Sequence, residues 1–171
     1  MRTRVGYAGG STQDPTYHDL ADHTEVFQVD YDPRMLRYEE LLDEIWKNRR
    51  GGRAYSRQYM EAVFCANAAQ ERIARDRGIT APIITGARFY RAEDYHQKYY
   101  LRHDAILMKE LAGYTPAQLA DSTVAARLNG YAAGKGTLAQ LHDDLPRLGL
   151  SPAGNAHLEK LVGQRARITC G

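Results

Sequence analysis

The strongest constraint on the fold is a change of pattern near residue 103. Before it, stretches that alternate apolar and polar side chains, as strands do, take turns with stretches of helical spacing. After it the strand patterns vanish, and Thr115-Pro116 and Ser151-Pro152 each pair a helix-capping residue with a proline, as helix starts do. The sequence therefore predicts an α+β core over residues 1–102 and a helical extension over residues 103–171.

The order of the expected elements restricts the fold of the core. The expected strands are 2–8, 24–31, 58–66 and 83–90, and the expected helices are 36–48, 68–77 and 92–102, followed by 116–133, 137–145 and one from 152. This order predicts a ferredoxin-like two-layer sandwich that lacks its first β-α unit. The first strand is central in that sandwich, so its loss leaves backbone groups without partners. We therefore expect exposed sheet edges that favour dimerisation or aggregation.

Composition and charge exclude several classes of protein. Of 171 residues, 43% are hydrophobic and 26% charged, which is ordinary for a globular protein, and the net charge of +2 gives no electrostatic case for a nucleic-acid partner. No apolar run approaches the roughly 20 residues of a membrane span. The first residues also lack an apolar signal core, so we expect a cytoplasmic protein without a membrane partner. Cys65 and Cys170 form neither a disulfide framework nor a zinc ligand set, and we expect no metal.

One stretch, residues 6–25, concentrates residues of chemical interest. Gly9 and Gly10 permit a tight turn and the close approach of a ligand. Tyr17 offers a phenolic donor, and His23 and Glu25 are titratable groups at the start of an expected strand. Two interpretations remain open for this stretch on residue types alone: a small polar site on a rigid sheet, or a solvated loop between two strands.

An ordered set of motifs then resembles a known family. RVGYAGG, PTY, DHTEVFQVDYDP, YEELLDEIW, RQY and FYRAEDYHQKYYL follow one another over residues 2–102 and resemble peptide methionine sulfoxide reductase A. VAARLNGYAAG and LGLSP in the remainder resemble the helical extension of one branch of that family. The resemblance implies reduction of the S epimer of methionine sulfoxide, in oxidised proteins or peptides or as the free amino acid. It implies no bound cofactor, with thioredoxin or another dithiol as external reductant.

The resemblance also assigns roles to residues of this chain. In the family a cysteine thiolate attacks the sulfoxide sulfur, the oxygen leaves after protonation, and the cysteine becomes a sulfenic acid. The resemblance places Tyr17, Glu25 and Tyr59 at the sulfoxide oxygen. A Glu25 shielded from water would retain a proton to deliver, and the two phenols would donate hydrogen bonds as negative charge builds on oxygen.

Supporting roles follow from the same resemblance. Gly9, Gly10 and His23 are expected to support substrate binding. Cys170, near the C-terminus, is the candidate for a resolving thiol that would form a disulfide for thioredoxin to reduce.

The sequence departs from the family at the catalytic thiol. The Gly-Cys-Phe-Trp motif that precedes GYAGG in the family, and that carries the nucleophile and the aromatic residues around the substrate methyl group, does not occur here. Ala54 or a neighbour replaces an acidic residue that many members carry before RQY. Cys65 is a poor substitute, since it lies six residues after Tyr59 on the same expected strand, about 20 Å away. We expect Cys65 to be a small buried hydrophobe.

Three interpretations follow. We favour a reductase whose start was placed too late, so that the chain as written is N-terminally truncated and inactive alone. The alternative is a short protein that keeps the oxygen-binding groups without the nucleophile, either a methionine-sulfoxide-binding module or a decayed pseudoenzyme, in which Cys170 would be a relic. An unrelated binding or scaffold protein on the same sandwich is the third.

Overall fold

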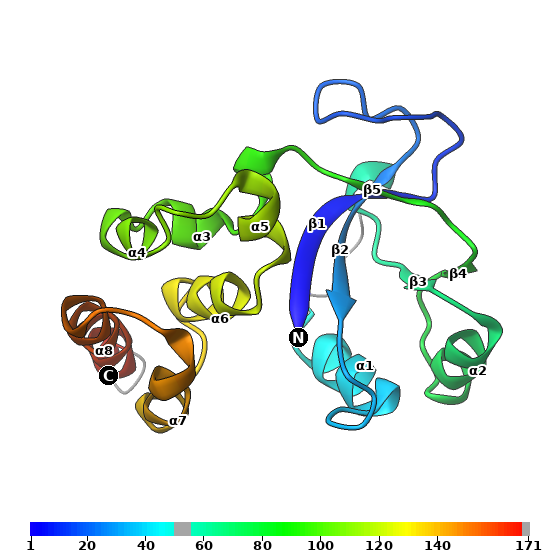
Figure 1. The fold of residues 1–171 in the computed structure, drawn as a ribbon. Helices are drawn as coiled ribbons and strands as arrows, with labels where there is room; N and C mark the ends of the chain where they lie inside the picture. The colour runs from blue at the N-terminus through cyan, green and yellow to red at the C-terminus, as the bar shows by residue number, and fades with distance from the viewer. Residues whose placement is uncertain (50–55, 169–171) are drawn as a thin grey trace. The chain divides into compact units, whose positions relative to one another are not determined.

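The computed structural model of the chain describes residues 1–49 and 56–168 (Figure 1). Two compact units make up the chain: Val5–Glu93 is one, and Met1–Arg4 together with Asp94–Gly171 is the other. Strands and helices are interspersed as far as residue 91, and the regular elements described from there to residue 168 are helices. None of the helices in the described part of the chain is long and apolar enough to cross a bilayer.

Two small sheets organise the strands. β1 (Arg2–Ala8), β2 (Thr24–Asp30) and β5 (Phe89–Arg91) form a three-stranded sheet in the order β2-β1-β5. β1 runs antiparallel to β5. A Cβ atom on Gly6 would collide with the Tyr90 carbonyl oxygen and the Phe89 ring, so the two strands need glycine there to pack this closely. β3 (Val63–Cys65) and β4 (Ile83–Thr85) form a separate parallel pair. The α+β class is confirmed, and the ferredoxin-like layering stays a prediction.

Two of the four expected strands are corrected. Residues 58–66 do not form one strand, because Arg57–Tyr59 is a 3₁₀ helix, η1, and only Val63–Cys65 is extended. Tyr59 and Cys65 therefore do not share a strand, and the premise of the distance estimate between them is wrong. Residues 83–90 are also divided, since Gly86 takes a φ of +79° and the chain leaves one sheet for the other there. Side-chain alternation does not reveal a left-handed residue inside a run.

The helices of the first unit begin and end largely where the sequence predicts. α1 spans Tyr38–Lys47 and α2 spans Ala68–Asp76. Asn67 caps α2 by accepting a hydrogen bond from the Gln70 N–H at 3.0 Å, and Gly78 follows the helix with a φ of +67°. A small core forms where Leu42 of α1, Cys65 of β3 and Ala74 of α2 meet.

All regular elements described beyond Glu93 in the second unit are helices, joined by short turns. Its elements are η2 (Asp94–His96), α3 (Tyr99–Arg102), α4 (Ala105–Glu110), α5 (Pro116–Asp121), α6 (Thr123–Ala132), α7 (Leu138–Leu148) and α8 (Pro152–Ile168). Lys98, with a φ of +56°, divides the expected helix 92–102, and Ser122, with a ψ of 132°, divides the expected helix 116–133. α7 contains Pro146 and continues to Leu148, beyond the expected end at residue 145. α4 was not among the expected helices.

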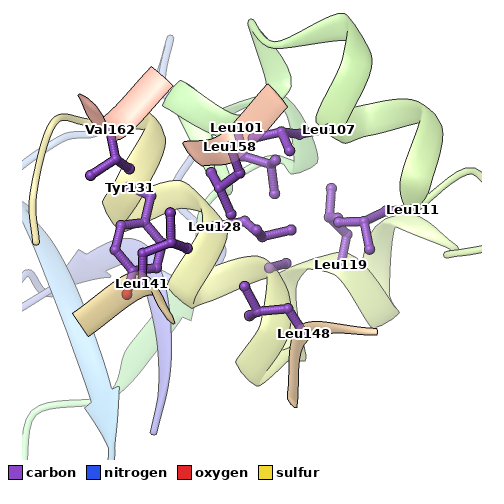
Figure 2. Packing of buried hydrophobic residues seen from close by; sticks show 11 residues of the cluster. Leu101, Leu107, Leu111, Leu119, Leu128, Tyr131, Leu141, Leu148, Leu158 and Val162 are labelled. Atoms are coloured by element: carbon purple, nitrogen blue, oxygen red, sulfur yellow. The ribbon is translucent and has the colours of Figure 1, made fainter. Parts of the chain in front are cut away.

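Leucines from these helices form the core of the second unit, as Figure 2 shows. Leu101, Leu107, Leu128, Leu141 and Leu158 are each 0% exposed. Each fully buried leucine contributes about 1.5–3 kcal/mol through removal of apolar surface from water. The helices beyond Glu93 therefore pack around a hydrophobic core of their own.

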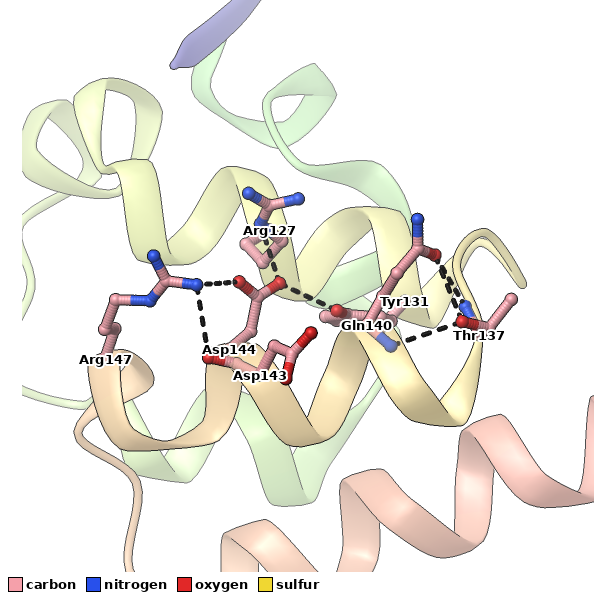
Figure 3. A network of polar contacts seen from close by, with 7 residues as sticks. All are labelled: Arg127, Tyr131, Thr137, Gln140, Asp143, Asp144 and Arg147. Atoms are coloured by element: carbon pink, nitrogen blue, oxygen red, sulfur yellow. Dashed lines mark hydrogen bonds and ion pairs between the residues drawn. The ribbon is translucent and has the colours of Figure 1, made fainter. Parts of the chain in front are cut away.

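A buried carboxylate joins α6 to α7 (Figure 3). Asp144 is 8% exposed and accepts hydrogen bonds from the Tyr131 hydroxyl at 2.7 Å and from Arg147 at 3.0 Å. Arg127 Nε lies 3.1 Å from the same carboxylate. At the start of α7, Thr137 and Gln140 form a reciprocal capping box. The Tyr131 and Arg127 contacts to Asp144 link α6 to α7, whereas the Arg147 contact and the capping box are local to α7.

Candidate functional site

The tight turn expected of the glycines lies directly after β1. Gly9 takes a φ of +81°, and a Cβ atom on it would lie 2.8 Å from Phe64 Cε1. A Cβ atom on Gly10 would lie 2.6 Å from Asp22 Oδ1. Larger residues are therefore excluded at both positions by backbone conformation, by close packing, or by both. The turn begins the long loop that separates β1 from β2 in Figure 1.

His23 holds this loop together from inside. It is 1% exposed, and its ring meets Tyr90 edge-on at 5.4 Å between centroids. The Gly10 N–H donates to Nδ1 at 3.2 Å, and Nε2 lies 2.9 Å from the Thr12 carbonyl oxygen. Because an amide N–H only donates and a carbonyl only accepts, Nε2 carries the ring proton. Both ring nitrogens of His23 are thus engaged by the loop itself.

Asp22 adds a second clamp on the same loop. The Ser11 N–H donates to Asp22 Oδ1 at 2.8 Å, and this hydrogen bond holds the pKa of the carboxyl below its usual value. Asp22 was not among the predicted site residues.

Tyr17 stands at the tip of a turn. Thr16 and Asp19 close the turn with two backbone hydrogen bonds of 3.1 Å, which leaves Tyr17 at its outer side. The Tyr17 N–H donates to Glu93 Oε1 at 2.9 Å, and the Tyr17 side chain is 43% exposed. The other carboxylate oxygen of Glu93 accepts from the Tyr7 hydroxyl at 2.8 Å. The sequence pattern did not single out Glu93 as a site residue. It placed Glu93 only among the acidic residues in the first turn of the expected helix 92–102.

Glu25 and the η1 turn that carries Tyr59 lie close together. Glu25, the second residue of β2, accepts a hydrogen bond on Oε1 from Gln58 Nε2 at 2.7 Å. Beside it, the Thr24 hydroxyl donates to the Arg57 carbonyl oxygen at 3.0 Å. Because Arg57, Gln58 and Tyr59 are the three residues of η1, these bonds bring the acid next to the tyrosine's turn.

The same turn reaches the glycines. Arg57 Nη2 donates to the Gly9 carbonyl oxygen at 3.1 Å. Hydrogen bonds thus join Gly9 and Glu25 to the turn Arg57–Tyr59, and these five residues are here named the β2–η1 cluster. Arg57 and Gln58 were not predicted as site residues, because only the fold shows that they reach the start of β2.

The expectation that Glu25 is shielded from water is not met in the chain by itself. Glu25 is exposed, and Tyr59 is 58% exposed. The cluster therefore presents an acid, an amide and a phenol at an open surface. The Gln58 amide and the Tyr59 phenol are able to donate hydrogen bonds to a polar oxygen that docks on the cluster.

Cys65 is the single cysteine within the described residues. It is 4% exposed, as predicted, and its Sγ lies 3.7 Å from the Tyr38 hydroxyl. Burial raises the pKa of the Cys65 thiol, which disfavours the reactive thiolate. Cys170 and Ala54 lie outside the described residues. Within residues 1–49 and 56–168, no three His, Cys, Asp or Glu side chains gather as metal ligands would.

Comparison with known proteins places the chain in a family. The sequence profile named Peptide methionine sulfoxide reductase matches residues 1–126. A peptide methionine sulfoxide reductase of Drosophila melanogaster is 38% identical over 181 residues, which cover 96% of this chain and 73% of that protein. Peptide methionine sulfoxide reductase A5 of Arabidopsis thaliana is 34% identical, with 78% of this chain and 59% of that protein covered. Its namesake in Oryza sativa subsp. japonica is 35% identical with the same coverage. The chain belongs to the peptide methionine sulfoxide reductase family.

Proposed function

We propose that this chain supplies the oxygen-facing part of a peptide-methionine (S)-S-oxide reductase site. Tyr17, Glu25 and Tyr59 would contact the sulfoxide oxygen, and Gly9, Gly10 and His23 would shape the loop that borders it. The observation that supports this most directly is the 2.7 Å hydrogen bond from Gln58 to Glu25, which holds the acid beside the turn of Tyr59. The names of the related proteins support the same reaction class.

The proposed chemistry assigns each group a separate task. Breaking the S–O bond requires a thiolate at sulfur and proton donors at oxygen, which leaves as water. Glu25 would deliver a proton once a bound substrate shields it from water, and the phenols of Tyr17 and Tyr59 would stabilise charge on the oxygen. A sulfoxide and two thiols yield a sulfide, a disulfide and water. The second thiol would be Cys170 or an external dithiol such as thioredoxin, and the substrates would be oxidised proteins, peptides or free methionine sulfoxide.

The nucleophile has to come from elsewhere than Cys65, whose thiol is buried and has a raised pKa. We therefore expect residues 1–171 alone to reduce no methionine sulfoxide peptide in the presence of dithiothreitol. The assay measures the methionine peptide formed, by chromatography. Turnover that disappears in Cys65→Ser would contradict this expectation. A Gly-Cys-Phe-Trp run in the in-frame codons before Met1 would identify the missing nucleophile, whereas an in-frame stop there would leave the second function below.

The second candidate function is binding of methionine sulfoxide without catalysis. The exposed β2–η1 cluster favours this function, because binding, unlike reduction, needs no thiol. Calorimetry with a methionine sulfoxide peptide should then detect binding by residues 1–171. Glu25→Gln and Tyr59→Phe should each weaken binding by about three- to tenfold, the effect of losing one hydrogen bond. Tyr114→Phe is the matched control, since Tyr114 is 40% exposed and lies in the other unit. The same affinity in all four proteins would reject a role of the cluster in sulfoxide binding.

A further inference from the structure

The loop that presents Tyr17 has little apolar surface with which to hold its shape. Of residues 11–20, only Pro15 is buried, and most of the others are exposed. Burial of apolar area is the main source of rigidity in a folded chain, so this loop depends on its polar contacts. Gly10, Ser11 and Thr12 are tied to Asp22 and His23 at the base of the loop. The tip, at Tyr17, lies beyond these ties.

Glu93 provides the contact at the tip. Glu93 directly follows Ala92 in the chain. The Ala92 N–H donates to the Val5 carbonyl oxygen at 3.1 Å, and this bond continues the pairing of β5 with β1 up to the residue before Glu93. Its Oε2 accepts from the Tyr7 hydroxyl at 2.8 Å, and Tyr7 is 2% exposed within β1. The carboxylate is thus fixed to the sheet by its own backbone and by a buried phenol.

The second oxygen of the same carboxylate extends to the loop. Oε1 accepts from the Tyr17 N–H at 2.9 Å, across 76 residues of sequence. Two hydrogen bonds to one carboxylate are stronger than two hydrogen bonds between neutral groups, because both are charge-assisted. The Tyr17 backbone is therefore tied to the sheet as well as to its own turn, and the Tyr17 ring projects from an anchored point.

We propose that Glu93 is a positioning residue for Tyr17, which it holds where the phenol meets the oxygen of a bound sulfoxide. The role of the phenol in this inference rests on the proposed function. The anchoring of Tyr17 by Glu93 is independent of that function. Glu93 itself touches no substrate; it acts through the Tyr17 backbone. Loss of the carboxylate should release the tip of the loop while the sheet and both hydrophobic cores remain folded.

The anchoring is tested by hydrogen exchange of the Tyr17 amide, measured by nuclear magnetic resonance on the full chain. Glu93→Ala should accelerate this exchange about tenfold or more, the effect of losing one charge-assisted hydrogen bond. Glu93→Gln should stay close to wild type, because its amide oxygen accepts from Tyr17 while its N–H₂ donates to the Tyr7 oxygen. Glu39→Ala, a change of the same kind on α1, is the control. Equal exchange in Glu93→Ala and wild type would overturn the proposal.

The role in binding is tested by calorimetry with a methionine sulfoxide peptide and the same peptide unoxidised. The ratio of the two affinities removes any general loss of folded protein. Glu93→Ala and Tyr17→Phe should each lower this ratio by about three- to tenfold, and the double variant should lower it no further. Additive losses, or an unchanged ratio in Glu93→Ala, would overturn the proposal. Glu93→Asp, which keeps the charge but is too short to span both donors, should behave like Glu93→Ala and replaces it if that variant does not fold.

A wild-type chain that does not distinguish the two peptides would reject the proposed function instead. In that event the exchange rate of the Tyr17 amide still decides whether Glu93 anchors the loop, so the two failures are distinguishable.

Discussion

Among single residues, Lys98 has the most unusual environment. It adopts a left-handed backbone with a φ of +56° and is 5% exposed. Its ammonium donates to the Thr3 carbonyl oxygen at 2.6 Å and to the Ala120 carbonyl oxygen at 2.7 Å. Burial, and to a smaller degree the nearby charge of Arg4, lowers the pKa of Lys98 to about 8. A lysine held by two carbonyls in this way fastens the start of the chain to the end of α5.

This pKa predicts a pH dependence of stability. Between pH 8 and the ordinary value of 10.5, the unfolded chain keeps a proton on Lys98 that the folded chain has lost. Unfolding takes up a proton in this window, so the contribution of Lys98 to the free energy of unfolding increases as pH rises. Urea unfolding at pH 7.5, 8.5 and 9.5 should show this increase in wild type and not in Lys98→Met. Parallel pH profiles for the two proteins would contradict the prediction.

His23 allows a prediction at the same scale. Its two hydrogen bonds require a proton on Nε2 and a lone pair on Nδ1. The ¹⁵N chemical shifts of the ring should therefore be those of the Nε2–H tautomer, and the Nε2 proton should exchange slowly because His23 is 1% exposed. Ring shifts of the Nδ1–H tautomer would show that the loop between β1 and β2 closes differently.

At the scale of elements, the junction of α6 and α7 depends on Asp144. Burial and the hydrogen bond to Asp144 raise the pKa of Tyr131 to about 12. Asp144→Ala would leave the buried Tyr131 hydroxyl without its acceptor, so we expect a loss of about 1–3 kcal/mol in the free energy of unfolding. Urea unfolding measures this loss. Arg147→Ala is the comparison: the Arg147 side chain is 73% exposed, so its removal should cost about 0–1 kcal/mol. Equal effects of the two changes would contradict the special importance of the buried acceptor.

Elements also show how far the sequence determines the structure. Alternation correctly identified residues 2–8 and 24–31 as strands, and Asn67 and Gly78 correctly marked the ends of α2, because these signals are local. The strands expected at 58–66 and 83–90 were partly wrong, because η1 and the left-handed Gly86 interrupt runs that still alternate. The same limit applies to the candidate site. The turn at Gly9 and Gly10 was predictable, because it depends on local residue types. The anchor at Glu93 was not, since its partners Tyr7 and Tyr17 lie 86 and 76 residues away.

At the scale of the whole molecule, the two compact units differ in what stabilises them. The unit from Asp94 onward has a large leucine core, whereas the core of Val5–Glu93 centres on three buried side chains, Leu42, Cys65 and Ala74. Because stability scales with buried apolar area, Val5–Glu93 should open at lower urea concentrations. Hydrogen exchange followed by mass spectrometry, unit by unit, measures this order. Simultaneous loss of protection in both units would show that they unfold as one.

Because Cys65 is buried, its labelling measures the opening of the Val5–Glu93 unit. Its thiol is 4% exposed and lies among side chains of α1, α2 and the β3–β4 pair, so a thiol-reactive dye meets it only when these elements separate. In a Cys170→Ser chain, the rate of dye attachment would therefore report how readily the Val5–Glu93 unit opens. A ligand that binds the β2–η1 cluster of the folded chain would stabilise this unit and slow dye attachment to Cys65. The labelling rate would then report whether the cluster is occupied, although Cys65 does not contact it.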